Sequence, residues 1–302
     1  MLRDSYGREV TGLRLSVSSR CNLRCFYCHM EGQREGAREM TPGEIGGIAR
    51  IAAELGVRSV KITGGEPLIR EDIGEIVGEI SRAGIRDISM TTNGVLLAEN
   101  AASLRKEGLC RVNVSLDTLD PELYWRITGE RALPDVLAGI EAAKEAGLSP
   151  IKINMVLLSG LNEGGVDEMM KYAFGMGAIL QIIEYVPARG RSGLSVRSDL
   201  ADVERMLEGR AVGVFVRPEM QMRRRYVLQG GEVEVVRPMH NSEFCMHCTR
   251  LRVTSDGRLK PCLMREDGAV DLVSYIRAGD RKGAREAFLR AVVARRPFWA
   301  GR

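Results

Sequence analysis

Residues 13–28 read LRLSVSSRCNLRCFYC, and this stretch decides the fold. Its first five residues, 13–17, form a short, mostly apolar run typical of a strand, and the rest is a loop that carries three cysteines. Similar short runs alternate with amphipathic stretches from here to about residue 186. This alternation is typical of a parallel sheet whose strands are joined by crossover helices.

The alternating region contains six predicted strands and five predicted helices. The strands are expected at residues 13–17, 59–63, 87–91, 111–116, 151–157 and 180–186. The helices are expected near residues 42–55, 72–83, 97–107, 133–146 and 163–175, the first opened by a capping box at residues 41–44. Six strands are fewer than the eight of a closed barrel. The predicted fold class is therefore α/β, a partial, open β/α barrel of about six parallel strands.

The pattern changes after Arg189. Residues 189–198 are rich in Gly, Arg and Ser and are predicted to be a linker. It separates the barrel, residues 1–190, from a smaller C-terminal α+β domain, residues 191–302. This second domain is predicted to hold a helix near 199–208, strands around 212–217, 225–229, 232–237 and 250–254, a hairpin turn at 255–257, and one or two helices between 270 and 294. We expect it to pack against one end of the barrel.

Composition narrows the class of protein. Of the 302 residues, 44% are hydrophobic and 28% charged, which excludes disordered and fibrous classes. A net charge of +4 does not predict nucleic-acid binding but suits an anionic small substrate. No apolar run approaches the roughly 18 residues of a membrane helix, and residues 1–10 lack the apolar core of a signal peptide. The sequence predicts a soluble cytoplasmic protein with no nucleic-acid or membrane partner.

Six of the seven cysteines fall into two triplets, and the cytoplasm favours metal ligands or buried thiols over disulfides. The first triplet is Cys21-x3-Cys25-x2-Cys28. Three thiolates can each hold one iron of a [4Fe–4S] cluster, which leaves the fourth iron without a protein ligand. An open coordination position is typical of catalytic rather than structural sites. A zinc site that lacks one ligand is the alternative.

The second triplet is Cys245-x2-Cys248-x13-Cys262, and it leaves one iron open in the same way. The alternative is a zinc knuckle with His240 or His247 as the fourth ligand. No role is assigned to these two histidines or to His29. The seventh cysteine, Cys110, is predicted to be a small buried hydrophobe.

With Tyr27 just before its last cysteine, the first triplet resembles the radical S-adenosylmethionine (SAM) superfamily. A second mark of that superfamily is Gly64-Gly65-Glu66-Pro67 after the second predicted strand. The resemblance implies that SAM chelates the open iron, with the backbone of this turn against the SAM amino group and the glycines permitting that approach. It also implies SAM contacts at Tyr27, Gly65, Ser115 and Val186.

Residues 245–262 closely resemble the C-terminal cluster motif of the GTP 3′,8-cyclase family, within the same superfamily. Further matching strings lie between about residues 12 and 276, at 13–17, 20–22, 62–68, 91–94, 112–117 and 183–185. The family implies a lyase of molybdenum cofactor biosynthesis with two [4Fe–4S] clusters, in which a SAM-derived radical takes the C3′ hydrogen of GTP and C3′ joins C8. The expected product is (8S)-3′,8-cyclo-7,8-dihydroguanosine 5′-triphosphate.

The resemblance also implies the substrate contacts. They are Arg14, Lys61, Thr91, Lys152, Arg250, Leu251 and Arg252. Gln181 departs from the family, which has an arginine at this position of the sixth strand. Residues 223–225, three consecutive arginines, are expected to be solvated surface side chains.

The expected partners follow from the resemblance, and two alternative functions stay open. The family implies an electron donor and the next pathway enzyme, cyclic pyranopterin monophosphate synthase, and either a monomer or a homodimer is expected. A first alternative is another radical SAM enzyme with one auxiliary cluster, acting on a peptide or a tetrapyrrole. A second is a regulatory protein that binds iron–sulfur clusters or zinc without catalysis.

Overall fold

Six parallel strands form the centre of the sheet, in the order in which they follow one another along the chain. The structure, a computed structural model, describes residues 1–32, 38–187, 200–265 and 267–299. The six strands are β1 (Gly12–Ser16), β2 (Ser59–Thr63), β3 (Asp87–Thr92), β4 (Arg111–Ser115), β5 (Ile151–Leu157) and β6 (Ile179–Glu184). Each lies within two residues of its predicted range, so the predicted parallel sheet is confirmed.

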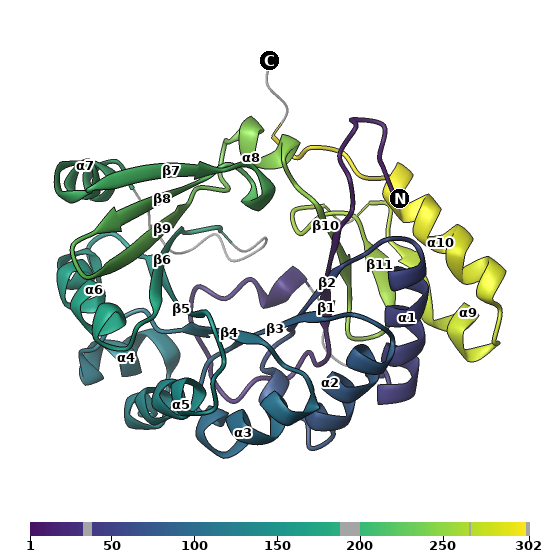
Figure 1. Ribbon diagram of the computed structural model, residues 1–302, viewed down its shortest axis with the longest axis horizontal. Helices are drawn as coiled ribbons and strands as arrows, with labels where there is room; N and C mark the ends of the chain where they lie inside the picture. Colours follow the sequence, from purple (N-terminus) through teal and green to yellow (C-terminus); the bar gives the residue numbers. More distant parts are fainter. Residues whose placement is uncertain (33–37, 188–199, 266, 300–302) are drawn as a thin grey trace.

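Helices connect these strands and cover the outer face of the curved sheet (Figure 1). They are α1 (Pro42–Glu54), α2 (Ile73–Arg82), α3 (Leu97–Glu107), α4 (Pro121–Thr128), α5 (Leu133–Glu145) and α6 (Val166–Gly175). The predicted capping box of α1 is present, because the Thr41 side chain accepts from the Glu44 N–H and the Glu44 carboxylate accepts from the Thr41 N–H. Helix α4 was not predicted, although Asp120 caps it by accepting from the Leu123 N–H at 2.7 Å.

The C-terminal part alternates short strands with helices. Its elements are α7 (Ala201–Arg210), β7 (Gly213–Arg217), β8 (Arg223–Leu228), β9 (Gly231–Val236), α8 (Ser242–Met246), β10 (Arg250–Val253), β11 (Arg258–Lys260), β12 (Val270–Asp271), α9 (Val273–Arg277) and α10 (Arg281–Val293). Short 3₁₀ segments are η1 (Met30–Gly32), η2 (Pro67–Ile69), η3 (Glu163–Gly165) and η4 (Pro218–Met220). The sequence predicted these elements except α8, β11, β12 and the 3₁₀ segments; for β11 it predicted only the hairpin turn at 255–257 that precedes it.

The C-terminal strands extend both edges of the central sheet (Figure 1). Strand β10 pairs in parallel with β1, and β9 pairs in parallel with β6. The resulting order is β12-β11-β10-β1-β2-β3-β4-β5-β6-β9-β8-β7. The structure therefore differs from the expectation of packing at one end. The physical reason is that an open barrel has two edges with unpaired N–H and C=O groups, and the C-terminal strands pair with both.

An apolar core fills the space between the outer helices and the sheet. Ile48 of α1, Ile76 of α2 and Val136 of α5 are fully buried there, together with Ile62 and Met90 of the strands. The inner face of the sheet carries polar side chains instead, which alternate along the strands with the core residues. The predicted linker, residues 189–198, lies outside the described residues. Within the described part of the chain, no helix is both long and apolar enough to cross a membrane.

Candidate functional site

A cavity of about 410 Å³ brings together side chains from all six central strands, from the loop after β1 and from the C-terminal elements. Every site residue expected from the sequence lines this cavity except Leu251. Leu251 is fully buried in the apolar core. It lies between Arg250 and Arg252 on β10, so strand alternation turns its side chain away from the cavity and leaves only its backbone for a role there.

The first cysteine triplet lies on the loop that follows β1. Cys21, Cys25 and Cys28 are not joined in disulfides and line the cavity. The Leu23 N–H donates to Cys21 Sγ at 3.4 Å, and the Met30 N–H donates to Cys28 Sγ at 3.3 Å. Three thiols facing one cavity, with backbone N–H groups directed at two of the sulfurs, fit a [4Fe–4S] cluster. Burial raises the pKa of the Cys21 and Cys25 thiols.

The turn after β2 is tied to the same loop. The Gly65 N–H donates to Ser18 O at 2.8 Å, and the Glu66 N–H donates to Arg20 O at 2.8 Å. A Cβ on Gly64 would lie 2.4 Å from Ser18 O, and one on Gly65 would lie 2.0 Å from Arg20 O. The glycines are therefore required by the approach of the two loops, in addition to any approach to a ligand.

Glu66 and Asp117 are buried carboxylates that hold the loops around the first triplet. Glu66 accepts from Thr92 Oγ1 at 2.7 Å and from the Asn93 N–H at 2.6 Å, and burial raises its pKa to about 7. Asp117 accepts from the Tyr27 hydroxyl at 2.5 Å, and burial raises its pKa to about 6. Asp117 thus fixes the aromatic ring that precedes Cys28.

The second triplet faces the cavity from the C-terminal part. Cys245, Cys248 and Cys262 are free thiols, and the Trp299 N–H donates to Cys245 Sγ at 3.5 Å. The Cys248 thiol has a lowered pKa, because the positive charges of Arg295 and Arg250 outweigh the effect of burial. These features fit a second cluster in the same way as the first.

Neither of the two histidines near the second triplet, His240 and His247, points to its cysteines as a fourth ligand would. His240 stacks on Trp299 with ring centroids 4.0 Å apart, and His247 Nδ1 lies 2.9 Å from Glu243 O. Among the described residues, no three His, Cys, Asp or Glu side chains converge closely enough to hold a single metal ion. A cubane is bound through different irons, so its thiolates need not converge on one point.

The lining of the cavity is strongly basic. It includes ten Arg and Lys residues and only two carboxylates, Glu31 and Glu66. Arg252, Arg14 and Lys61 are side-by-side partners on β10, β1 and β2, about 4.8 Å apart from strand to strand. Like charges this close need compensation. Glu31 supplies part of it, because its carboxylate pairs with Arg14 at 3.3 Å and with Arg252.

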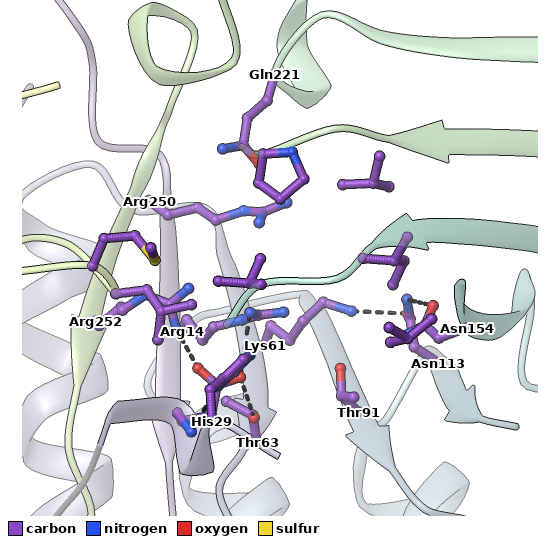
Figure 2. Close-up of a pocket in the computed structure, with 18 of the residues that line it drawn as sticks. Arg14, His29, Lys61, Thr63, Thr91, Asn113, Asn154, Gln221, Arg250 and Arg252 are labelled. Carbon is purple, nitrogen blue, oxygen red and sulfur yellow. Dashed lines mark hydrogen bonds and ion pairs between the residues drawn. The ribbon is translucent and has the colours of Figure 1, made fainter. Parts of the chain in front are cut away.

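The lysines and arginines of the lining differ in the groups that pair with them or accept their hydrogen bonds. Lys61 reaches across the sheet and donates to Asn113 Oδ1 at 2.8 Å, while Arg14, Arg250 and Arg252 converge from β1 and β10 (Figure 2). Burial lowers the pKa of Lys61 well below its usual range, and the charges of Arg14 and Arg250 add to the effect. Lys152 pairs with Glu234, yet burial still lowers its pKa to about 8. An anionic ligand is the complement of this lining.

Comparison with known proteins places the chain in a family. Residues 15–173 match the family model of the radical SAM superfamily, and residues 178–300 match that of Molybdenum Cofactor Synthesis C. A probable GTP 3′,8-cyclase of Methanothermobacter marburgensis is 47% identical over 99% of both chains. Its counterpart in Methanocaldococcus jannaschii is 44% identical, also over 99% of both. The chain belongs to the GTP 3′,8-cyclase family of radical SAM proteins.

Solved radical SAM structures share the fold of this cyclase-family chain. SuiB of Streptococcus suis bound to S-adenosylmethionine has a TM-score of 0.68 at 20% identity, over 94% of this chain and 72% of that one. The protein anSMEcpe with bound AdoMet has a TM-score of 0.62 at 17% identity, over 89% and 79%. At these identities the likeness concerns the fold alone.

Two further polar residues of the C-terminal half line the cavity. Gln181 donates to Glu234 Oε2 at 2.8 Å. Arg223 also lines the cavity and is only 7% exposed, so its prediction as a solvated side chain was wrong. Its neighbour Arg224 is half-exposed and pairs with Glu208, as expected for a surface arginine.

Sequence reasoning missed several lining residues outside the motifs. They include His29, Glu31, Asn154, Gln221 and Arg223, together with Arg8, Arg111, Arg295 and Arg296; Asn113 lies within the matching string 112–117 but was not named. Asn113 and Asn154 could have been found, because each lies between two core residues on a predicted strand and so faces the other side of the sheet. Ser115 and Val156, two residues further along the same strands, were already expected or found to line the cavity. Glu31 had a weaker signal, its place three residues after Cys28. Thr91, which was predicted, has a buried Oγ1 with no hydrogen-bond partner in the described structure.

Proposed function

We propose that this chain is a radical SAM GTP 3′,8-cyclase that converts GTP to (8S)-3′,8-cyclo-7,8-dihydroguanosine 5′-triphosphate in molybdenum cofactor biosynthesis. The observation that carries the proposal is one cavity faced by two cysteine triplets and lined by an excess of cations over carboxylates. Relatives that cover the whole chain bear this activity in their names.

The two triplets would hold the two clusters, at Cys21, Cys25 and Cys28 and at Cys245, Cys248 and Cys262. With SAM bound, the first cluster supplies the 5′-deoxyadenosyl radical that removes a hydrogen atom from the substrate. The chain's own residues hold the reactants together and exclude water. Tyr27, Gly65, Ser115 and Val186 are proposed to contact SAM.

Substrate binding is assigned to the cations of the inner face. Arg14, Lys61, Lys152, Arg250 and Arg252 would offset the charges of the triphosphate by charge-assisted hydrogen bonds. Thr91 would donate its free hydroxyl, and only the backbone of Leu251 is available to a ligand in the cavity.

We propose a division of labour between residues 1–190 and 191–302. The first part would hold the first cluster and SAM, and the second part the second cluster. Strand β10 joins the two parts, because its Arg252 is the in-register neighbour of Arg14 on β1. An external electron donor and cyclic pyranopterin monophosphate synthase are the proposed partners.

Anaerobic turnover tests this function. The iron-loaded protein is incubated with SAM, dithionite and GTP, and the products are separated by liquid chromatography with mass spectrometry. We expect 5′-deoxyadenosine and a species with the mass of GTP at a new retention time. Cys25→Ala should abolish both, whereas Cys110→Ala, outside the cavity lining, should retain them.

Two results would contradict the proposal in different ways. Deoxyadenosine without an isomer of GTP would retain radical SAM chemistry but point to a peptide or tetrapyrrole substrate. Fully iron-loaded protein that makes no deoxyadenosine would exclude the enzyme.

A further inference from the structure

Most cations of the cavity are neutralised by a carboxylate. Arg14 and Arg252 share Glu31, Lys152 pairs with Glu234, Arg111 pairs with Asp87, and Arg8 and Arg295 share Asp4. Within the described residues, no ion pair is formed by three other lining cations, the buried Arg223 and the partly buried Lys61 and Arg250. Lys61 and Arg250 are already among the expected substrate contacts. Arg223 is not.

Arg223 is a buried guanidinium that forms no ion pair among the described residues and feels the charge of Glu234 only at longer range. Its Nε is buried and has no hydrogen-bond partner, and its contact with Gln221 Oε1 is long, at 3.5 Å. Burial lowers its pKa to about 10, so the side chain is still charged at neutral pH. Leaving a charge buried and unpaired is costly, and such a group in a cavity wall is satisfied when an anion binds there.

The preceding turn directs Arg223 inward. Gln221 and Met222 have φ values of 65° and 56°, a left-handed conformation that is unfavourable for residues other than glycine. This turn begins β8 so that Arg223 faces the cavity, and Gln221, two residues before it, also points into the cavity, on the side of Arg250 (Figure 2). Arg224, the next residue, points to the other face of the strand.

Glu234, the nearest buried carboxylate, is already engaged. It pairs with Lys152 and with Arg217, and it accepts from the amide of Gln181. Gln181 lies on β6, and β9 and β8 follow it in the sheet. Arg223 therefore enters the cavity from the same side of the sheet as β6, a strand that presents Gln181 there and carries no Arg or Lys.

We infer that Arg223 binds the anionic end of the substrate, from the side of the cavity where β6 presents Gln181 and no cation. That this anionic end is a triphosphate rests on the proposed function. The structure itself indicates a polyanion, and the basic wall formed with Lys61 and Arg250 is its site.

The test compares Arg223→Gln with Arg223→Lys and with Arg224→Gln as the matched control. Binding to the iron-loaded protein is measured by calorimetry for three probes: GTP, guanosine and inorganic tripolyphosphate. We expect Arg223→Gln to weaken GTP and tripolyphosphate binding by about 10- to 100-fold, the effect of a lost charge-assisted hydrogen bond. Guanosine binding should change by less than about twofold in every variant, the scatter expected of a site that retains its base contacts.

The two other variants separate the effect of charge from that of geometry. Arg223→Lys keeps the positive charge but not the paired N–H donors of the guanidinium, so its loss of affinity for GTP and tripolyphosphate should be intermediate. Arg224→Gln should bind all three probes as the wild type does. Unchanged tripolyphosphate binding in Arg223→Gln, or an equal loss for guanosine and GTP, would overturn the inference.

The design also separates this inference from the proposed function. If the wild type isomerises GTP and Arg223→Gln binds it normally, only the inference fails. If the wild type does not isomerise GTP but Arg223→Gln still loses tripolyphosphate binding, the proposed function fails and the polyanion site stands.

Discussion

Glu234 is a fully buried carboxylate on β9 that serves two cations at once, Lys152 and Arg217. Glu234→Gln would leave Lys152 without a counter-charge and Arg217 with only the exposed Glu219, and breaking a buried pair in this way costs roughly 3–5 kcal/mol. We expect the free energy of unfolding to fall by about that amount in urea denaturation at pH 7. Glu232→Gln on the same strand removes a partly exposed pair with Arg225, and should cost less than about 1 kcal/mol. Equal losses would contradict the role of Glu234.

The same carboxylate predicts a pH dependence. Burial would raise the pKa of Glu234, but the charge of Lys152 outweighs it and holds the pKa at about 2. Because this folded-state pKa lies below that of an ordinary glutamate, the stabilisation is complete above about pH 4.5 and is lost as the pH falls toward 2. The difference in unfolding free energy between the wild type and Glu234→Gln should be about 1 kcal/mol smaller at pH 4 than at pH 7. A difference that grows on acidification would refute this assignment.

Single residues were predictable where a motif marks them. The cysteines could be placed from their spacing, and the glycine turn from its resemblance to the superfamily motif. Three consecutive arginines, by contrast, carry no local sign of which one faces a cavity. Arg223 turns inward because of the left-handed turn at Gln221 and Met222. Neither of these two residues is a glycine, so the sequence carries no sign of a left-handed turn there.

At the scale of elements, the loops after β1 and β2 form one unit through their backbones. Gly65→Ala would place a Cβ 2.0 Å from Arg20 O, a backbone atom that cannot move without shifting the loop that carries Cys21. Overpacking of this kind costs about 1–3 kcal/mol. We expect Gly65→Ala to lower the melting temperature and the iron content of the purified protein. Gly43→Ala on α1, with no atom within 4 Å of the added methyl, should leave both unchanged or raise the melting temperature slightly. Normal iron content in Gly65→Ala would show that the loop tolerates the shift.

Most elements were predictable because turn residues and β-branched runs delimit them. Strand β5 and helix α3 agree with prediction residue for residue. Helix α4 was missed although Asp120 and Pro121 form a recognisable start, because its eight residues are short for a periodic pattern. Helix α8 is shorter still and follows no apolar repeat.

At the scale of the whole molecule, pairing between distant segments decides where the C-terminal strands lie. Gly12 on β1 is the partner of Arg250 on β10, and Leu180 on β6 is the partner of Val233 on β9. No local pattern encodes such pairings, so the sequence could suggest the strands but not the edges that they join. The consequence is one sheet that encloses the cavity from both sides.

A continuous sheet should open as one cooperative unit. Losing β9 or β10 would expose an edge of β6 or β1 and remove the walls that carry Arg223 and Arg250, so the two parts of the chain stabilise each other. We expect hydrogen exchange of the iron-loaded protein in increasing denaturant to give the same opening free energy for peptides over β10 and β1, and likewise for β9 and β6. The helix α7, at the outer end of the sheet, serves as an internal reference and should exchange earlier. If β9 and β10 lost protection at a lower denaturant concentration than β2 to β5, the C-terminal strands would be a separate unit docked on a barrel that is stable alone.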